Sequence, residues 1–110
     1  MTTRVKRYGF ALDAEHRLRS TIALARGKVT HWAVQLERLE PEEGWVWIAR
    51  YDSAGGTVHR DRNRIAAHEP VALPDVAGKA VRAAVEDFKA RAQEYTEGYL
   101  AAKAAGRAPW

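Results

Sequence analysis

Apolar and polar side chains alternate along most of the first sixty residues, which is the period of strands that bury one face. This alternation predicts four strands and a shorter fifth one, over residues 4–12, 17–25, 29–39, 45–52 and 57–62. Short segments rich in glycine, proline and charged residues separate these strands. One of them contains Gly55 and Gly56, a pair that permits the positive φ angles of a tight turn. We expect an irregular surface connection over residues 63–74.

The fourth strand differs from the others because it is apolar on both faces. The alternation places Val46 and Ile48 on one face. It places Trp45, Trp47 and Tyr51 on the other face. A strand that buries both faces belongs in the middle of a sheet, so we expect the third and fourth strands to be central.

After Pro74 the apolar period changes from two residues to nearly four, which indicates a helix over about residues 75–102. Asp75 is the expected N-cap. The apolar stripe of the helix consists of Val81, Val85, Phe88, Ala92, Tyr95 and Tyr99. The sequence therefore predicts an α+β fold, with an antiparallel four- to five-stranded meander sheet followed by one long helix packed on it. We expect one domain over residues 1–110, with a frayed tail over 103–110.

The composition is that of an ordinary globular protein, with 46% hydrophobic and 29% charged residues among 110. The chain has no cysteine, which excludes disulfides, thiolate nucleophiles and cysteine-ligated zinc. It has neither the apolar stretch of a signal peptide near its start nor an apolar run that could cross a bilayer. We therefore expect a cytoplasmic protein without membrane contact, as a monomer or homodimer.

Basic residues exceed acidic ones by 18 to 14, for a net charge of +4. Much of the excess lies between Arg4 and Arg26, and a local basic surface attracts polyanions such as RNA. Solvated strand faces explain scattered basic residues equally well. The candidate nucleic-acid contacts are Arg17, Arg19, Arg60 and Arg62.

The densest polar cluster brackets the glycine turn. If the flanking segments pair as a hairpin, the side chains that come together are Arg50, Asp52, His59 and Asp61. In such a group His59 can draw the proton from a ribose 2′-hydroxyl and a carboxylate can orient its ring. Arg50 or Arg60 can stabilise the charge that develops on the phosphate. A network of ion pairs that only fixes the hairpin is the structural alternative.

No other histidine extends this cluster in the sequence. His16 falls in a turn, His31 lies on a strand face and His68 lies in the irregular segment. Neither a histidine pair at helical spacing nor a phosphate-binding glycine loop is present, so we expect no metal and no cofactor.

The same residues carry a family resemblance. The run Arg50-Tyr51-Asp52, then Gly56, then His59-Arg60-Asp61 resembles the signature of a family of small bacterial proteins of unknown function, RYD-x-x-HG-x-x-HRD. More distantly, it is similar to the TumE-like toxins of toxin–antitoxin systems. Gly55 stands where the first histidine of the signature would be, so half of a histidine pair is absent. The resemblance implies the fold and the place of a site.

Two classes of function follow from these observations. The first is a toxin-like or accessory protein that acts on or binds RNA, at most as a metal-independent ribonuclease, with an antitoxin as its protein partner. The second is a non-catalytic interaction or structural module that binds another protein through a strand edge or a helix face.

Overall fold

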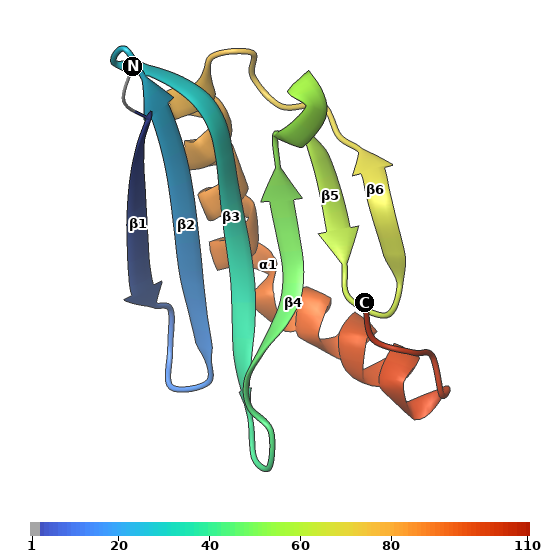
Figure 1. Cartoon of the computed structure of the whole chain (residues 1–110). Coiled ribbons are helices and arrows are strands. Elements are labelled where there is room, and N and C mark those ends of the chain that lie inside the picture. The colour runs from blue at the N-terminus through green and yellow to red at the C-terminus, as the bar shows by residue number, and fades with distance from the viewer. Residues whose placement is uncertain (1–2) are drawn as a thin grey trace.

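The computed structural model describes residues 3–110 and consists of one six-stranded antiparallel sheet followed by one long helix (Figure 1). The strands are β1 (Thr3–Ala11), β2 (His16–Ala25), β3 (Lys28–Glu40), β4 (Gly44–Asp52), β5 (His59–Arg62) and β6 (Ala66–Pro70). A short 3₁₀ turn, η1 (Ala54–Gly56), joins β4 to β5, and the helix is α1 (Ala77–Ala104). The predicted α+β class with a meander sheet and a packed C-terminal helix is confirmed.

Each strand pairs only with its neighbours in the chain, in the order β1 to β6, so β3 and β4 are the two central strands as predicted. The strand count differs from the expected four or five. Residues Ala66–Pro70 form a strand inside the segment that the sequence indicated as irregular. β5, expected at the edge of the sheet, is consequently covered by β6.

The helix packs on one face of the sheet, and the core lies between them. The strands contribute Leu18, Val34 and Leu36, which are fully buried, and the helix contributes Phe88 and Tyr99. Burying a side chain of this size stabilises the fold by about 1.5–3 kcal/mol, more than helix propensity supplies. The opposite face of the sheet carries no helix, and we call it the open face.

The helix begins later than the sequence indicated. Its N-cap is Val76 and no side chain caps it, so the expectation that Asp75 is the cap is wrong. At the other end, Gly106 adopts a left-handed φ of 79° while the N–H groups that follow the helix donate to carbonyls of its last turn. Ala80 and Ala84 are buried more deeply than Val81 and Val85, which were predicted for the apolar stripe and are only partly buried.

A bulge in β4 changes which side chains of this strand share a face, compared with the prediction. Trp47 pairs with Glu37 and Ala49 pairs with the adjacent Leu36, so Ile48 is an extra residue in the ladder. Because the bulge resets the alternation, Tyr51 faces the helix whereas Trp47 stays on the open face.

Candidate functional site

The two charged triplets of the sequence form the β4–β5 ladder. Arg50 pairs with Asp61, Tyr51 with Arg60, and Asp52 with His59. Gly55 and Gly56 between them adopt φ angles of 78° and 83°, the left-handed values that the sequence predicted for this turn. The hairpin thus brings together Arg50, Asp52, His59 and Asp61 on the open face.

On this face, Asp61 lies between an arginine and a histidine. Arg50 Nη2 donates to Asp61 Oδ2 at 3.3 Å, and His59 Nε2 lies 3.8 Å from the same oxygen. Burial raises the pKa of the Asp61 carboxyl, but the backbone N–H of His68 and the Arg50 guanidinium outweigh it and hold this pKa below its usual range. Asp61 therefore carries its negative charge at neutral pH.

A second histidine joins the group from β3. His31 Nε2 lies 3.0 Å from Asp52 Oδ1, and Asp52 also accepts the backbone N–H of Ala54 at 2.6 Å. Arg50 Nε lies 4.0 Å from Asp52 Oδ2 and is buried without a hydrogen-bond partner in the described chain. The open face therefore holds two histidine–carboxylate pairs, one on each side of Arg50.

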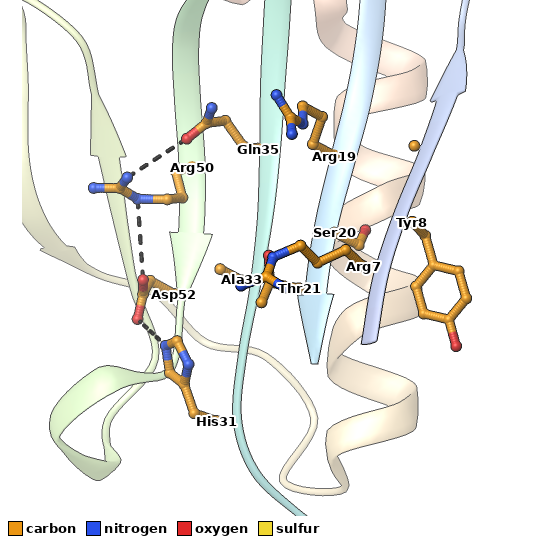
Figure 2. A pocket seen from close by; sticks show the side chains of 11 residues that line it. Arg7, Tyr8, Arg19, Ser20, Thr21, His31, Ala33, Gln35, Arg50 and Asp52 are labelled. Atoms are coloured by element: carbon orange, nitrogen blue, oxygen red, sulfur yellow. Dashed lines mark hydrogen bonds and ion pairs between the residues drawn. The ribbon is translucent and has the colours of Figure 1, made fainter. Parts of the chain in front are cut away.

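Beside these pairs the open face is hollowed (Figure 2). The hollow has a volume of about 500 Å³ and is lined by side chains of β1 to β4, among them Arg7, Arg19, Thr21, His31, Gln35, Arg50 and Asp52. We call it the sheet hollow. Figure 2 shows the guanidinium groups of Arg7 and Arg19 on the face that carries Arg50. Three arginines face one aspartate there, so the hollow favours an anionic ligand.

The four arginines predicted to contact nucleic acid do not lie together. Arg19 lines the sheet hollow, and Arg17 stacks on Trp45 and pairs with Glu37 at 2.6 Å on the same face. Arg60 and Arg62 lie on the helix side of the sheet, where both bind Glu69. Both arginines are therefore paired with a carboxylate of the same domain and lie away from the open face.

The helix-facing residues of the triplets form a separate polar cluster. Tyr51 donates its hydroxyl to Asp87 Oδ2 at 2.7 Å, Tyr95 donates to the same oxygen, and Arg60 donates to the Tyr95 hydroxyl at 3.0 Å. Burial and the bond to Asp87 raise the pKa of Tyr51 far above its usual range. Tyr51 thus stays a protonated donor that ties β4 to α1.

The sequence did not predict that Arg7, His31 and His68 lie at the site. His31 reaches Asp52 across the β3–β4 pair, and its alternation with buried Trp32 was a signal that it faces away from the core. His68 approaches Asp61 only because β6 exists, in a segment without strand periodicity. The register between strands, rather than the local sequence pattern, determines which of these residues lie next to each other.

A sequence-family profile described as a domain of unknown function, DUF7718, matches residues 2–105. The chain belongs to this family. The match includes the sheet, the turn η1 and the whole of α1, so the site described above lies inside the DUF7718 domain. No curated protein and no solved structure matches this DUF7718 chain. Over residues 3–110, none of the helices is long and apolar enough to span a membrane.

Proposed function

We propose that this DUF7718 protein binds single-stranded RNA across the open face and cleaves it without a metal ion. The observation that carries the proposal is the sheet hollow, where three arginines adjoin two histidine–carboxylate pairs. Guanidinium groups bind phosphates with paired hydrogen bonds, and an open sheet leaves room for an extended strand. Trp45, half-exposed beside Arg17, adds a stacking surface at the border of this face.

The chemistry follows from the two histidines. In this proposal His59 takes the proton of a ribose 2′-hydroxyl, and the 2′-oxygen attacks the adjacent phosphorus. His31 gives a proton to the departing 5′-oxygen, so the products are a 2′,3′-cyclic phosphate and a 5′-hydroxyl. Arg50, between the two pairs, neutralises the charge that develops on the phosphate. In this proposal His31 has the role of the second histidine, because position 55 is a glycine in this chain.

The likeness of the Arg50-Tyr51-Asp52 triplet, the following glycine and His59 to the corresponding features of TumE-like toxins supports the same class of function and adds an antitoxin as the protein partner. The edge strand β1 favours the second class, a protein-binding module. Val5, Tyr8 and Phe10 are about half-exposed on this strand, and its outer backbone groups are unpaired among residues 3–110. An interaction module would bind its partner there and show no affinity for RNA.

Charge reversal in the sheet hollow tests the proposal. Arg7 and Arg19 are exposed and form no ion pair within residues 3–110, so Arg7→Glu/Arg19→Glu changes the surface without breaking an internal contact. The matched control is Lys79→Glu/Arg82→Glu on the exposed side of α1, which changes the net charge equally. We expect the hollow variant to lower the affinity for a labelled single-stranded RNA at least tenfold and the control to change it less than threefold.

Salt provides the second arm of this test. Three neutralised phosphates give a slope of roughly −2, so the affinity should fall about 20-fold between 50 and 200 mM salt. Equal losses of RNA affinity in both charge variants, or an affinity that does not change with salt, would contradict RNA binding at this face.

A further inference from the structure

The pairing of β5 with β6 brings three metal-ligating side chains together on the open face. These are His59 and Asp61 on β5 and His68 on β6, and one donor atom from each lies within 4.8 Å of the other two. His59 Nε2 is 3.8 Å from Asp61 Oδ2, and His68 Nδ1 is 3.9 Å from Asp61 Oδ1. Both distances are too long for hydrogen bonds and leave space between the donor atoms.

One contact of His59 favours a particular tautomer of its ring. Its Nδ1 lies 3.4 Å from the carbonyl oxygen of Thr57, and because a carbonyl can only accept, this contact favours the tautomer with the proton on Nδ1. In the neutral ring, Nε2 then presents its lone pair toward the Asp61 carboxylate. Two lone pairs that face each other across 3.8 Å repel, and a cation between them removes this repulsion. Metal-binding histidines commonly donate their second ring nitrogen to a backbone carbonyl in this way.

Asp61 is held as an ionised ligand by contacts outside the triad. The backbone N–H of His68 donates to Oδ1 at 2.7 Å and Arg50 donates to Oδ2 at 3.3 Å. The Asp61 side chain is only 8% exposed, so these bonds fix its orientation. Each carboxylate oxygen keeps a further lone pair for a metal ion, and ligating carboxylates are normally hydrogen-bonded in this manner.

His68 is the most exposed of the three side chains. Its ring lies against that of His59, with the centroids 4.9 Å apart, and its side chain is 80% exposed. The backbone of His68 adopts a φ of 54°, an unusual value for a residue other than glycine, and the bond to Asp61 fixes it there. Rotation of an exposed side chain can therefore close the triad without moving the sheet.

We propose that His59, Asp61 and His68 form a binding site for a divalent transition-metal ion of the zinc type. Two imidazoles and one carboxylate are a ligand set of zinc sites whose fourth position is open to water. Donor atoms of a tetrahedral site with bonds near 2.1 Å lie about 3.4 Å apart, so a contraction of roughly 1 Å completes the geometry. Imidazole donors disfavour magnesium and calcium, which take oxygen ligands.

The site opens into a second hollow lined by Arg50, Thr57 and Pro70 in addition to the three ligands. The fourth position therefore faces solvent next to Arg50. The proposal goes beyond RNA cleavage and does not depend on it. A metal on His59 would occupy the lone pair that the proposed base uses, so the metal-bound protein would not cleave RNA by that route.

Metal titration without RNA tests this site. The full chain, freed of metal with a chelator, is titrated with Zn²⁺ by calorimetry and with Co²⁺ by visible absorption. We expect one equivalent to bind, with the intense visible bands of tetrahedral Co²⁺. His68→Asn removes one imidazole, and asparagine tolerates the left-handed backbone at this position. This variant should bind at least about tenfold more weakly while its circular dichroism stays unchanged.

The matched control is His31→Ala, which removes a histidine from the other carboxylate pair on the same face. It should bind Zn²⁺ like the unaltered protein. Absence of binding to the unaltered chain, equal affinity in His68→Asn, or equal loss in His31→Ala would each overturn the proposal. Because no RNA is present, these results are separate from those that decide the RNA proposal.

Discussion

Asp52 and Asp61 stand on neighbouring strands, and each has its own histidine. Asp52 is bonded to His31 at 3.0 Å, whereas His59 lies 3.8 Å from Asp61 and makes only a long contact to Thr57. His59 is therefore held more loosely than His31. A loosely held ring nitrogen is accessible to a substrate proton, whereas a histidine bonded to a carboxylate is fixed in its orientation.

Removal of His59 separates a catalytic role from a structural one. We expect His59→Ala to abolish RNA cleavage while lowering the free energy of unfolding by less than about 1 kcal/mol, because its contacts are long. Cleavage is followed by the appearance of 2′,3′-cyclic phosphate ends, with a chelator present, and stability by thermal unfolding of the same samples.

His68→Asn is the control for this experiment, since it alters the neighbouring ring and leaves the proposed base in place. Cleavage should persist in it. A large loss of stability in His59→Ala, without cleavage by the unaltered protein, would assign the histidine to the structural network. Gly55→His is less informative, because the φ of 78° at this position strains any side chain with a Cβ.

The residues of the β4–β5 site were predictable because one tight turn between two charged triplets fixes their register. Arg50, Asp52, His59 and Asp61 came together for this reason. Arg60 and Arg62 were predicted as nucleic-acid contacts from their charge, and strand alternation puts both on the helix side, where Glu69 binds them. Charge counts carry no information about the face on which a side chain lies.

Among the elements, α1 was the clearest from the sequence because its apolar stripe is long and regular. Its exact start was not, since Val76 precedes the helix without any side-chain cap to signal it. Within β4 only Tyr51 was assigned to the wrong face, because a bulge leaves no distinct pattern in an apolar strand. Its position depends on the pairing with β3, which local periodicity does not encode.

Phe88 joins the helix to the sheet and tests this packing. It is fully buried, with its ring centroid 5.0 Å from that of Tyr51 and 5.2 Å from that of Tyr95. Phe88→Ala should lower the free energy of unfolding by about 3–5 kcal/mol, because it empties an aromatic position that cannot collapse fully. Denaturant unfolding measures the change, and exposed Lys89→Ala, next to it in the helix, should change stability by less than about 0.5 kcal/mol.

A change below about 1 kcal/mol for Phe88→Ala would mean that the contact between α1 and the sheet contributes little. The main ties between sheet and helix would then be the Tyr51 hydroxyl, which donates to Asp87, and Arg60, which donates to the Tyr95 hydroxyl. The difference between Phe88→Ala and Lys89→Ala therefore compares a buried side chain with an exposed one on the same helix.

At the scale of the whole molecule, the two faces of the sheet carry different kinds of side chain. The helix side holds the apolar core together with its enclosed polar pairs. The open face holds Arg7, Arg19 and Arg50, so the modest net charge of +4 understates the local potential in the sheet hollow. The basic excess between Arg4 and Arg26 contains Arg7 and Arg19, but their position on one face with Arg50 depends on the pairing of β1, β2, β3 and β4.

The meander order has a consequence for how the protein opens. β1 pairs only with β2, and all of its residues are exposed, so it can detach without disturbing any other strand pair. β3 lies between two long partners and against the helix, and its release requires most of the fold to open. Amide hydrogen exchange followed by NMR should therefore show protection that rises from β1 to β3. Uniform protection across the sheet would instead indicate that all strands open in a single cooperative event, with β1 as firmly attached as the centre.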